Sequence, residues 1–134
     1  SAECLLDKPP SIAVSGIGQG EVSSQYIGVY EPVAKTFTGR WYYKNENSMT
    51  LYWEPGCSQH AFRYQEWLFS STVEVSTTAQ IDLDGGMCSY DGFFRSLSMT
   101  PVGTNLWGFY HQNDWITNLV TIEVAAKCPA GQEP

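Results

Sequence analysis

Short alternations of hydrophobic and polar residues run along the chain, and Gly, Pro, Asn and Asp separate them. A period of two places successive side chains on opposite faces of a β-strand, whereas a helical period is almost absent here. The clearest example is Leu119 to Val124, in which Val120, Ile122 and Val124 share one face. The pattern predicts an all-β protein.

Ten short strands are predicted from these alternations. They are expected at Ile12 to Val14, Tyr26 to Tyr30, Arg40 to Lys44, Met49 to Trp53, Phe62 to Phe69, Val73 to Val75, Ala79 to Leu83, Phe93 to Leu97, Leu106 to Tyr110 and Leu119 to Val124. Many short strands in one chain favour an antiparallel sandwich or barrel. We therefore expect residues 1–134 to form a single all-β domain, in which the strand at Ile12 pairs antiparallel with the strand that ends at Val124.

Four cysteines are spread over the chain at Cys4, Cys57, Cys88 and Cys128. They show no C-x-x-C spacing that would indicate zinc, and two disulfides are favoured over four free thiols. Three pairings of the four cysteines are possible. Pairing of the terminal strands would bring the two chain ends together, which favours Cys4 with Cys128 and therefore Cys57 with Cys88. Disulfides predict a secreted or extracellular protein, or one of another oxidising lumen.

The composition argues against several classes of partner. The net charge is −7, and the seven basic residues are scattered singly, so neither a nucleic-acid backbone nor an anionic lipid surface finds a basic cluster. No apolar run is long enough to span a bilayer, and Ser1 to Glu3 lacks the pattern of an export signal. We expect a mature chain that binds no nucleic acid and does not insert into a membrane.

Motifs for catalysis or cofactors are weak in this chain. Gly16-Ile17-Gly18-Gln19-Gly20 is glycine-rich, but no helix pattern follows it to aim an amino-terminal dipole at a phosphate. His60 and His111 lie in no recognisable nucleophile–base motif. We therefore expect a protein that is not an enzyme and that carries no cofactor.

A calcium loop is suggested only in part. Asp82-Leu83-Asp84-Gly85 supplies the opening oxygens of such a loop, yet Phe93 stands at position twelve, where a glutamate would close it. An irregular calcium site with Asp82, Asp84 and Asp91 stays an open alternative, and no metal site is predicted.

Aromatic residues are abundant, with five Trp, eight Tyr and six Phe. If the connection Asn45 to Ser48 pairs Lys44 with Met49, then Trp41, Tyr43 and Tyr52 share one face of a hairpin. A change of register by one residue would instead place Trp41 and Tyr43 in the core, which is the commoner fate of aromatic residues in half-buried strands.

An exposed aromatic face would suit the apolar faces of sugar rings or a partner protein. A second such patch is expected around the turn at Gln112 to Asp114. The candidate ligand-binding residues are therefore Trp41, Tyr43, Tyr52, Trp107, Tyr110 and Trp115.

A spaced series of motifs adds a resemblance to a known module. The series consists of Val14-Ser15-Gly16, Tyr26 with Gly28 and Tyr30, Gly39-Arg40, Tyr43-Lys44-Asn45, Leu51-Tyr52-Trp53 and Trp67. The series covers about half of the chain, and it resembles a module that is often repeated in large extracellular proteins of marine invertebrates and unicellular algae. The chain departs from that module at Thr38, where asparagine is expected, and in the extra cysteine between Pro55 and His60. The resemblance implies an extracellular β module and interaction rather than chemistry.

These features together favour a noncatalytic binding module for a glycan or glycoprotein. The alternative is a structural or accessory subunit of an extracellular matrix, coat or lumenal complex, in which the same aromatic residues bury against a partner protein. The oligomeric state, which the sequence leaves open, separates the two hypotheses.

Overall fold

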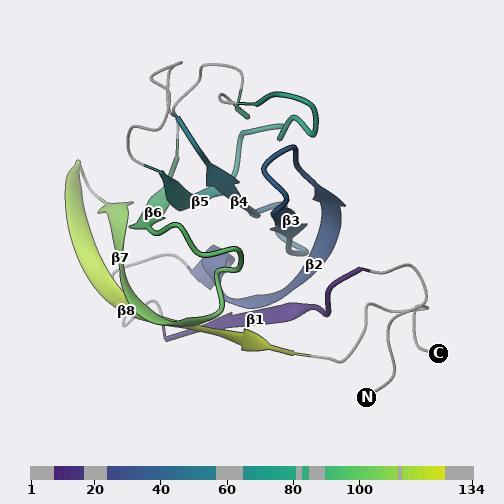
Figure 1. Cartoon of the computed structure of the whole chain (residues 1–134). Coiled ribbons are helices and arrows are strands. Elements are labelled where there is room, and N and C mark those ends of the chain that lie inside the picture. The colour runs from purple at the N-terminus through teal and green to yellow at the C-terminus, as the bar shows by residue number, and fades with distance from the viewer. Residues whose placement is uncertain are drawn as a thin grey trace.

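The computed structural model describes residues 8–16, 24–56, 65–80, 83–84, 90–111 and 113–125, and in these ranges eight antiparallel strands close into one barrel (Figure 1). The predicted all-β class and antiparallel barrel are thus confirmed. All four cysteines lie outside the described residues, so the two disulfides stay a prediction. The side chains of His60 and His111 and the motif residues 17–20 also lie outside this part of the chain.

Each strand of the barrel pairs with the next one in sequence, and the last pairs with the first. The elements are β1 Ile12–Ser15, a 3₁₀-helix η1 Ser24–Tyr26, β2 Gly28–Lys35, β3 Trp41–Lys44, β4 Thr50–Glu54, β5 Glu66–Ser70, β6 Gly92–Arg95, β7 Gly103–His111 and β8 Asp114–Val124. This up-and-down order is built entirely from local antiparallel pairs and one closing pair.

The closing pair joins β1 to β8. Ile12 lies opposite Val124, and Val14 lies opposite Ile122. This confirms the expected pairing of the terminal strands. Val14, Val120 and Ile122 are all buried, so the seam contributes side chains to the barrel interior as the other strand pairs do.

Two predicted strands, Val73 to Val75 and Ala79 to Leu83, are not found among the residues that the structure describes. Residues 73–80 form no strand, and Leu83 lies in a turn. Instead, the segment lies against the outer face of the barrel, where Val73 packs with Tyr52 and Leu68. The backbone N–H of Leu83 donates to Glu54 Oε1 at 3.0 Å, which fastens the segment to β4.

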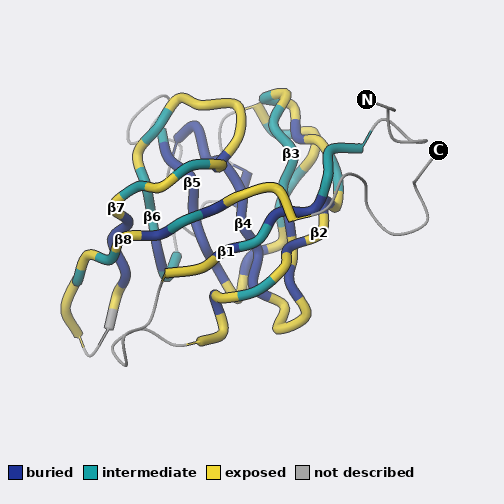
Figure 2. Tube along the Cα trace, turned by 90° about the horizontal axis from the view of Figure 1, so that it is seen from below, coloured by how far each residue is buried: buried dark blue, intermediate teal, exposed yellow. Residues whose placement is uncertain are grey.

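The barrel interior is filled by side chains, many of them aromatic. It contains Ile12, Val14, Tyr26, Tyr30, Tyr43, Met49, Leu51, Trp53, Trp67, Phe69, Trp107, Phe109, Val120 and Ile122. Phe69 and Trp107 have ring centroids 4.7 Å apart, and Figure 2 shows β4 and β5 buried along their length, in dark blue. An eight-stranded barrel is just wide enough to be filled in this way or to hold one small ligand. Here side chains occupy the interior, so the candidate binding site lies on the outer surface.

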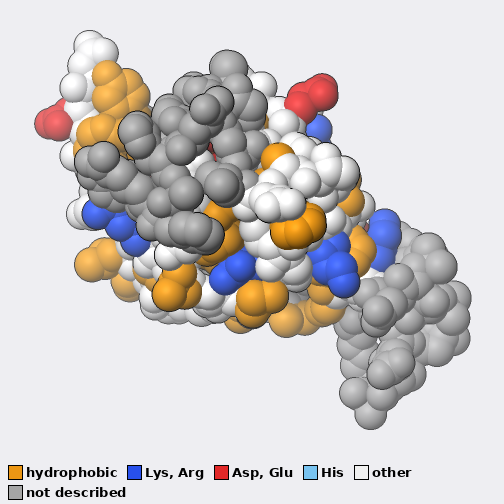
Figure 3. Space-filling model, turned by 45° about the horizontal axis from the view of Figure 1, so that its top comes forward, with side chains coloured by type: hydrophobic (Ala, Val, Ile, Leu, Met, Phe, Trp, Pro, Cys, Tyr) orange, Lys and Arg blue, Asp and Glu red, His pale blue; other side chains and the backbone are white. Residues whose placement is uncertain are grey.

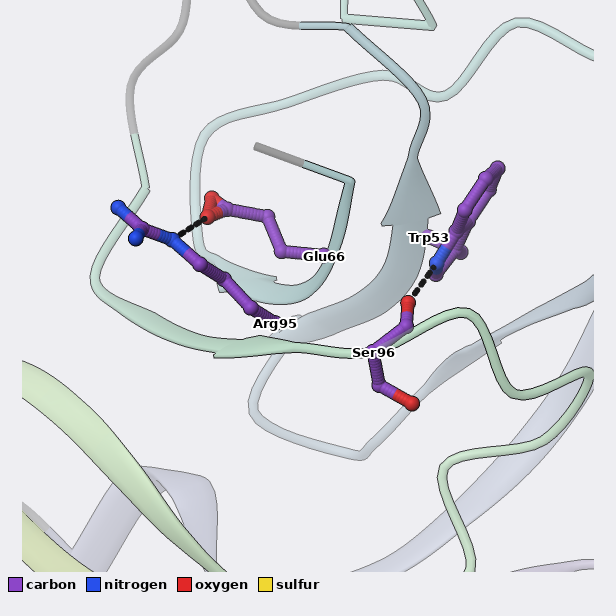
Figure 4. A network of polar contacts seen from close by, with 4 residues as sticks. All are labelled: Trp53, Glu66, Arg95 and Ser96. Carbon is purple, nitrogen blue, oxygen red and sulfur yellow. Dashed lines mark hydrogen bonds and ion pairs between the residues drawn. The ribbon is translucent and has the colours of Figure 1, made fainter. Parts of the chain in front are cut away.

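One end of the barrel is closed by the segment between β6 and β7. The Arg40 guanidinium carbon lies 3.5 Å from the centroid of a Trp53 ring, and Arg40 Nε donates to the carbonyl of Ser98 at 2.9 Å. Trp53 Nε1 donates to the carbonyl of Ser96 at 2.7 Å (Figure 4). These bonds satisfy the polar atoms of side chains that reach into the core.

Candidate functional site

The register of the β3–β4 hairpin differs from the prediction by one residue. Lys44 pairs with Thr50 and not with Met49. The cause is Asn45, whose Oδ1 accepts hydrogen bonds from the backbone N–H groups of Asn47 at 3.0 Å and Met49 at 2.8 Å. Because the N–H of Met49 is bonded to the Asn45 side chain, Met49 belongs to the connection and β4 begins at Thr50. The connection therefore has five residues, 45–49, and not four.

The predicted platform of Trp41, Tyr43 and Tyr52 is therefore wrong. Tyr43 is only 5% exposed and lies inside the barrel, and Trp41 packs against the same core. Tyr52 is fully buried on the opposite side of the wall, beneath Val73. The alternative in which Trp41 and Tyr43 belong to the core is confirmed, since a shift of one residue exchanges the two faces.

In the second predicted patch, two of the three residues are exposed and one is buried. Tyr110 is 50% exposed and Trp115 is 45% exposed, and the two residues pair across the β7–β8 hairpin. Trp107 is buried in the interior, because alternation along β7 places it on the face opposite to Tyr110. Figure 3 shows hydrophobic side chains, in orange at the upper left, over the tip of this hairpin.

Trp115 is the centre of an external group of aromatic rings. Its ring centroid lies 5.3 Å from that of Phe93 with an interplanar angle of 77°, 5.4 Å from that of Tyr110 at 61°, and 5.9 Å from that of Tyr90. The Tyr90 and Phe93 rings are 6.0 Å apart at 73°. Edge-to-face contacts of this kind hold each ring in place.

Three of these rings, those of Tyr90, Phe93 and Trp115, border a shallow cavity of about 280 Å³, which we call the aromatic pocket. Its lining residues are Tyr90, Phe93, Arg95, Gly108, Trp115, Ile116 and Thr117. Tyr90 lies two residues before β6, and the other lining residues belong to the strands β6, β7 and β8. The rigid sheet therefore positions most of the pocket.

A glycine makes room for the pocket. Gly108 lies opposite Phe93 in the β6–β7 pair and opposite Thr117 in the β7–β8 pair. A Cβ at Gly108 would lie 2.6 Å from Cε1 of Phe93. The Phe93 ring can lie across β7 only because residue 108 has no side chain.

One cation stands at the edge of the pocket. The Arg95 side chain is 60% exposed, and its Nε lies 3.7 Å from Oε1 of Glu66 on β5 (Figure 4). Glu66 itself is 2% exposed, and this burial raises its pKa to about 7, while the nearby Arg95 guanidinium acts in the opposite direction. Arg95 is also 5.7 Å from the Phe93 ring centroid, so it lines the pocket with both its charge and its stem.

Two of the three residues of the alternative calcium site can be placed. Asp84 is buried, and its Oδ2 accepts from the Tyr52 hydroxyl at 3.2 Å. Asp91 Oδ2 accepts from the N–H and the hydroxyl of Ser71, both at 3.2 Å. Asp82 lies outside the described residues. Within the part of the chain that the structure describes, no three His, Cys, Asp or Glu side chains are grouped as metal ligands would be.

The class of protein is defined by these features as a small antiparallel eight-stranded barrel with a filled interior and an external aromatic pocket. No family model, curated protein or solved structure matches the chain. In its described part, no helix is long and apolar enough to cross a membrane. Its function is therefore argued from the site.

Sequence reasoning missed several residues of the pocket, namely Tyr90, Phe93, Arg95 and Gly108. Alternation along the predicted strand from Phe93 does place Phe93 and Arg95 on one face. What the sequence does not indicate is that this face is the outer one and that it adjoins the face of Trp115.

Proposed function

We propose that this protein is a noncatalytic extracellular binding module that recognises a glycan at the aromatic pocket. The observation that carries the proposal is Trp115, a large side chain held 45% exposed beside other rings and next to a cation. The C–H faces of a sugar ring pack well against aromatic side chains, and the sugar hydroxyls then find polar groups at the border.

Pre-organisation supports the same proposal. Trp115, Phe93 and Tyr90 are fixed by mutual ring contacts and by the strands that carry them. Tyr110 is fixed at its hydroxyl, which donates to Oδ1 of Asn113 at 3.3 Å. Side chains that are already ordered lose little conformational entropy when a ligand binds, so more of the contact energy appears as affinity.

The extracellular setting is part of the proposal. It is supported by four widely spaced cysteines in the sequence, an even number that favours two disulfides. Mass spectrometry of the unreduced and the reduced, alkylated protein tests it. Two disulfides are expected, and four alkylated thiols before reduction would contradict an oxidising compartment.

Glycan-array binding by the wild type and by Trp115→Ala tests the binding function. Loss of a central aromatic residue is expected to reduce affinity by about tenfold or more. Leu119→Ala is the matched control, because Leu119 is exposed on the same strand and the same face but outside the pocket. An array without signal, or a Trp115→Ala protein that binds as the wild type does, would contradict the proposal.

A second candidate function is that of a structural subunit that docks against a partner protein. The observation in its favour is the pair Leu106 and Leu119, which face each other on the outer surface of the β7–β8 hairpin and are 64% and 57% exposed. Light scattering after size-exclusion chromatography separates the two functions. A stable assembly that Leu106→Lys disperses favours the subunit, and a strict monomer favours the glycan-binding module.

A further inference from the structure

We infer that the aromatic pocket takes the terminal residue of a neutral glycan and not an internal stretch of a polysaccharide chain. This inference rests on the proposed glycan-binding function. It concerns which part of a glycan is bound and with what charge.

The size of the pocket is the first reason. Its volume of about 280 Å³ lies just below the range of pockets for drug-sized molecules, which is about 300–1,000 Å³. One sugar ring fills a space of this size. The rest of a glycan would lie outside it, on the surface beyond the lining residues.

The angles between the rings are the second reason. An extended chain that binds along its length needs aromatic faces that are coplanar and aligned, so that successive sugar rings stack on them. Here Phe93 is inclined to Trp115 by 77°, and Tyr90 is inclined to Phe93 by 73°. Rings at such angles form a corner in the shallow cavity, which suits contact with one sugar ring and not a row of stacked rings.

The floor of the pocket points to the same conclusion. Phe93 lies across Gly108 and Trp115 stands on the adjoining strand β8, so the pocket has contact surfaces on more than one side. The terminal sugar of a glycan can enter such a corner, where one aromatic side chain contacts a face of the sugar ring and another contacts its edge. An internal residue has glycosidic bonds on both sides and would direct one of them at a wall.

Charge selects a neutral sugar. Among the lining residues that the structure describes, Arg95 is the one cation, and its Nε is 3.7 Å from Glu66 Oε1. Asp91 follows Tyr90 in the chain, and Asp114 precedes Trp115. Because these three acidic residues adjoin the lining residues in space or in sequence, and the chain has a net charge of −7, a carboxylated or sulfated sugar meets net repulsion, whereas sugar hydroxyls accept hydrogen bonds from Arg95.

Two measurements with defined probes test the inference. The probes are glucose, mannose and galactose, their short linear oligomers, and glucuronic and galacturonic acids as anionic analogues. Calorimetric titration is expected to give an affinity per molecule that changes by no more than about threefold as an oligomer lengthens. Saturation-transfer NMR is expected to show the aromatic contact on protons of one terminal ring.

A variant that fills the pocket completes the test. Thr117→Phe adds a ring at the pocket border without removing any existing ring, and an affinity loss of about tenfold or more is expected. Leu119→Phe adds the same ring one step away on the same face, outside the lining, and is expected to bind as the wild type does.

The outcomes separate this inference from the proposed function. If neutral oligomers bind through Trp115 but their affinity climbs about tenfold or more with chain length, or if interior rings receive the saturation, terminal recognition is overturned and glycan binding stands. Tighter binding of the uronic acids overturns the preference for a neutral sugar. If none of the probes and no array glycan binds, the proposed function and the inference both fall.

Discussion

Replacement of Glu66 by glutamine should change how the stability of the barrel depends on pH. The Glu66 carboxyl group is 2% exposed on the outer face of the wall, between Glu54 of β4 and Arg95 of β6. The 3.7 Å between Arg95 Nε and Glu66 Oε1 is too long for a hydrogen bond, so the ion pair only partly compensates for burial. Burial raises the pKa of Glu66 from 4.5 to about 7. Glutamine has nearly the same shape without the charge.

Whether stability rises or falls with pH depends on which state, folded or unfolded, holds the Glu66 proton. Below the unfolded pKa of 4.5 both states of Glu66 are protonated, and the residue has no effect on stability. Between 4.5 and about 7 the folded state holds a proton that the unfolded chain has released, so the free energy of unfolding falls by about 1.4 kcal/mol for each pH unit. Above about pH 7 the loss is constant at about 3 kcal/mol.

Urea unfolding followed by tryptophan fluorescence at several pH values measures this effect. Glu66→Gln is expected to match the wild type near pH 4 and to be more stable by up to about 3 kcal/mol near pH 8. Glu123→Gln, at an exposed position of β8, controls for the general loss of one negative charge. If the difference between Glu66→Gln and the wild type is the same at both pH values, or favours the wild type as pH rises, the argument from burial is refuted.

Three further predictions concern the core and the barrel end. Gly92→Ala places a Cβ 2.6 Å from the ring of Phe109 inside the barrel and should lower the free energy of unfolding by about 1–3 kcal/mol; an unchanged urea midpoint would contradict this. Arg40→Lys cannot keep both hydrogen bonds to main-chain carbonyl groups and the stacking of a planar guanidinium, so a loss of about 1–2 kcal/mol in thermal unfolding is expected. Burial raises the pKa of both Tyr26 and Tyr43 to about 12. Ultraviolet titration of the folded protein should therefore show these two phenols ionising well above the ordinary pKa of 10. Full ionisation of all tyrosines near pH 10 would contradict this prediction.

The strand content and the two candidate architectures, an antiparallel sandwich or an antiparallel barrel, could be predicted from the sequence, because alternation is a local property. Alternation does not distinguish a strand from an extended segment that lies on a sheet. Residues 73–80 were expected to contain strand for that reason, although Val73 packs on the outer face as part of a covering segment. The hairpin register was wrong because one side chain, Asn45, decides the length of the connection.

The candidate site could be predicted only where neighbouring residues build it. Tyr110 and Trp115 meet across a short turn, and the sequence places them together. Phe93 joins them through the pairing of β6 with β7, and Gly108 admits its ring. These depend on which outer positions of separate strands come side by side, and no local pattern contains that information.

The seam between β1 and β8 has a consequence for how the chain folds. Every other strand pair joins neighbours in sequence, whereas Ile12 must find Val124 at the far end of the described chain. Closing so long a loop lowers the chain entropy before the stabilising contacts between β1 and β8 can form. Closure of the barrel should therefore be the slow step of folding. Until then β1 and β8 have unpaired edges, and during synthesis β1 must wait for the last strand to emerge. A cell that makes this protein has to protect an open sheet for that interval.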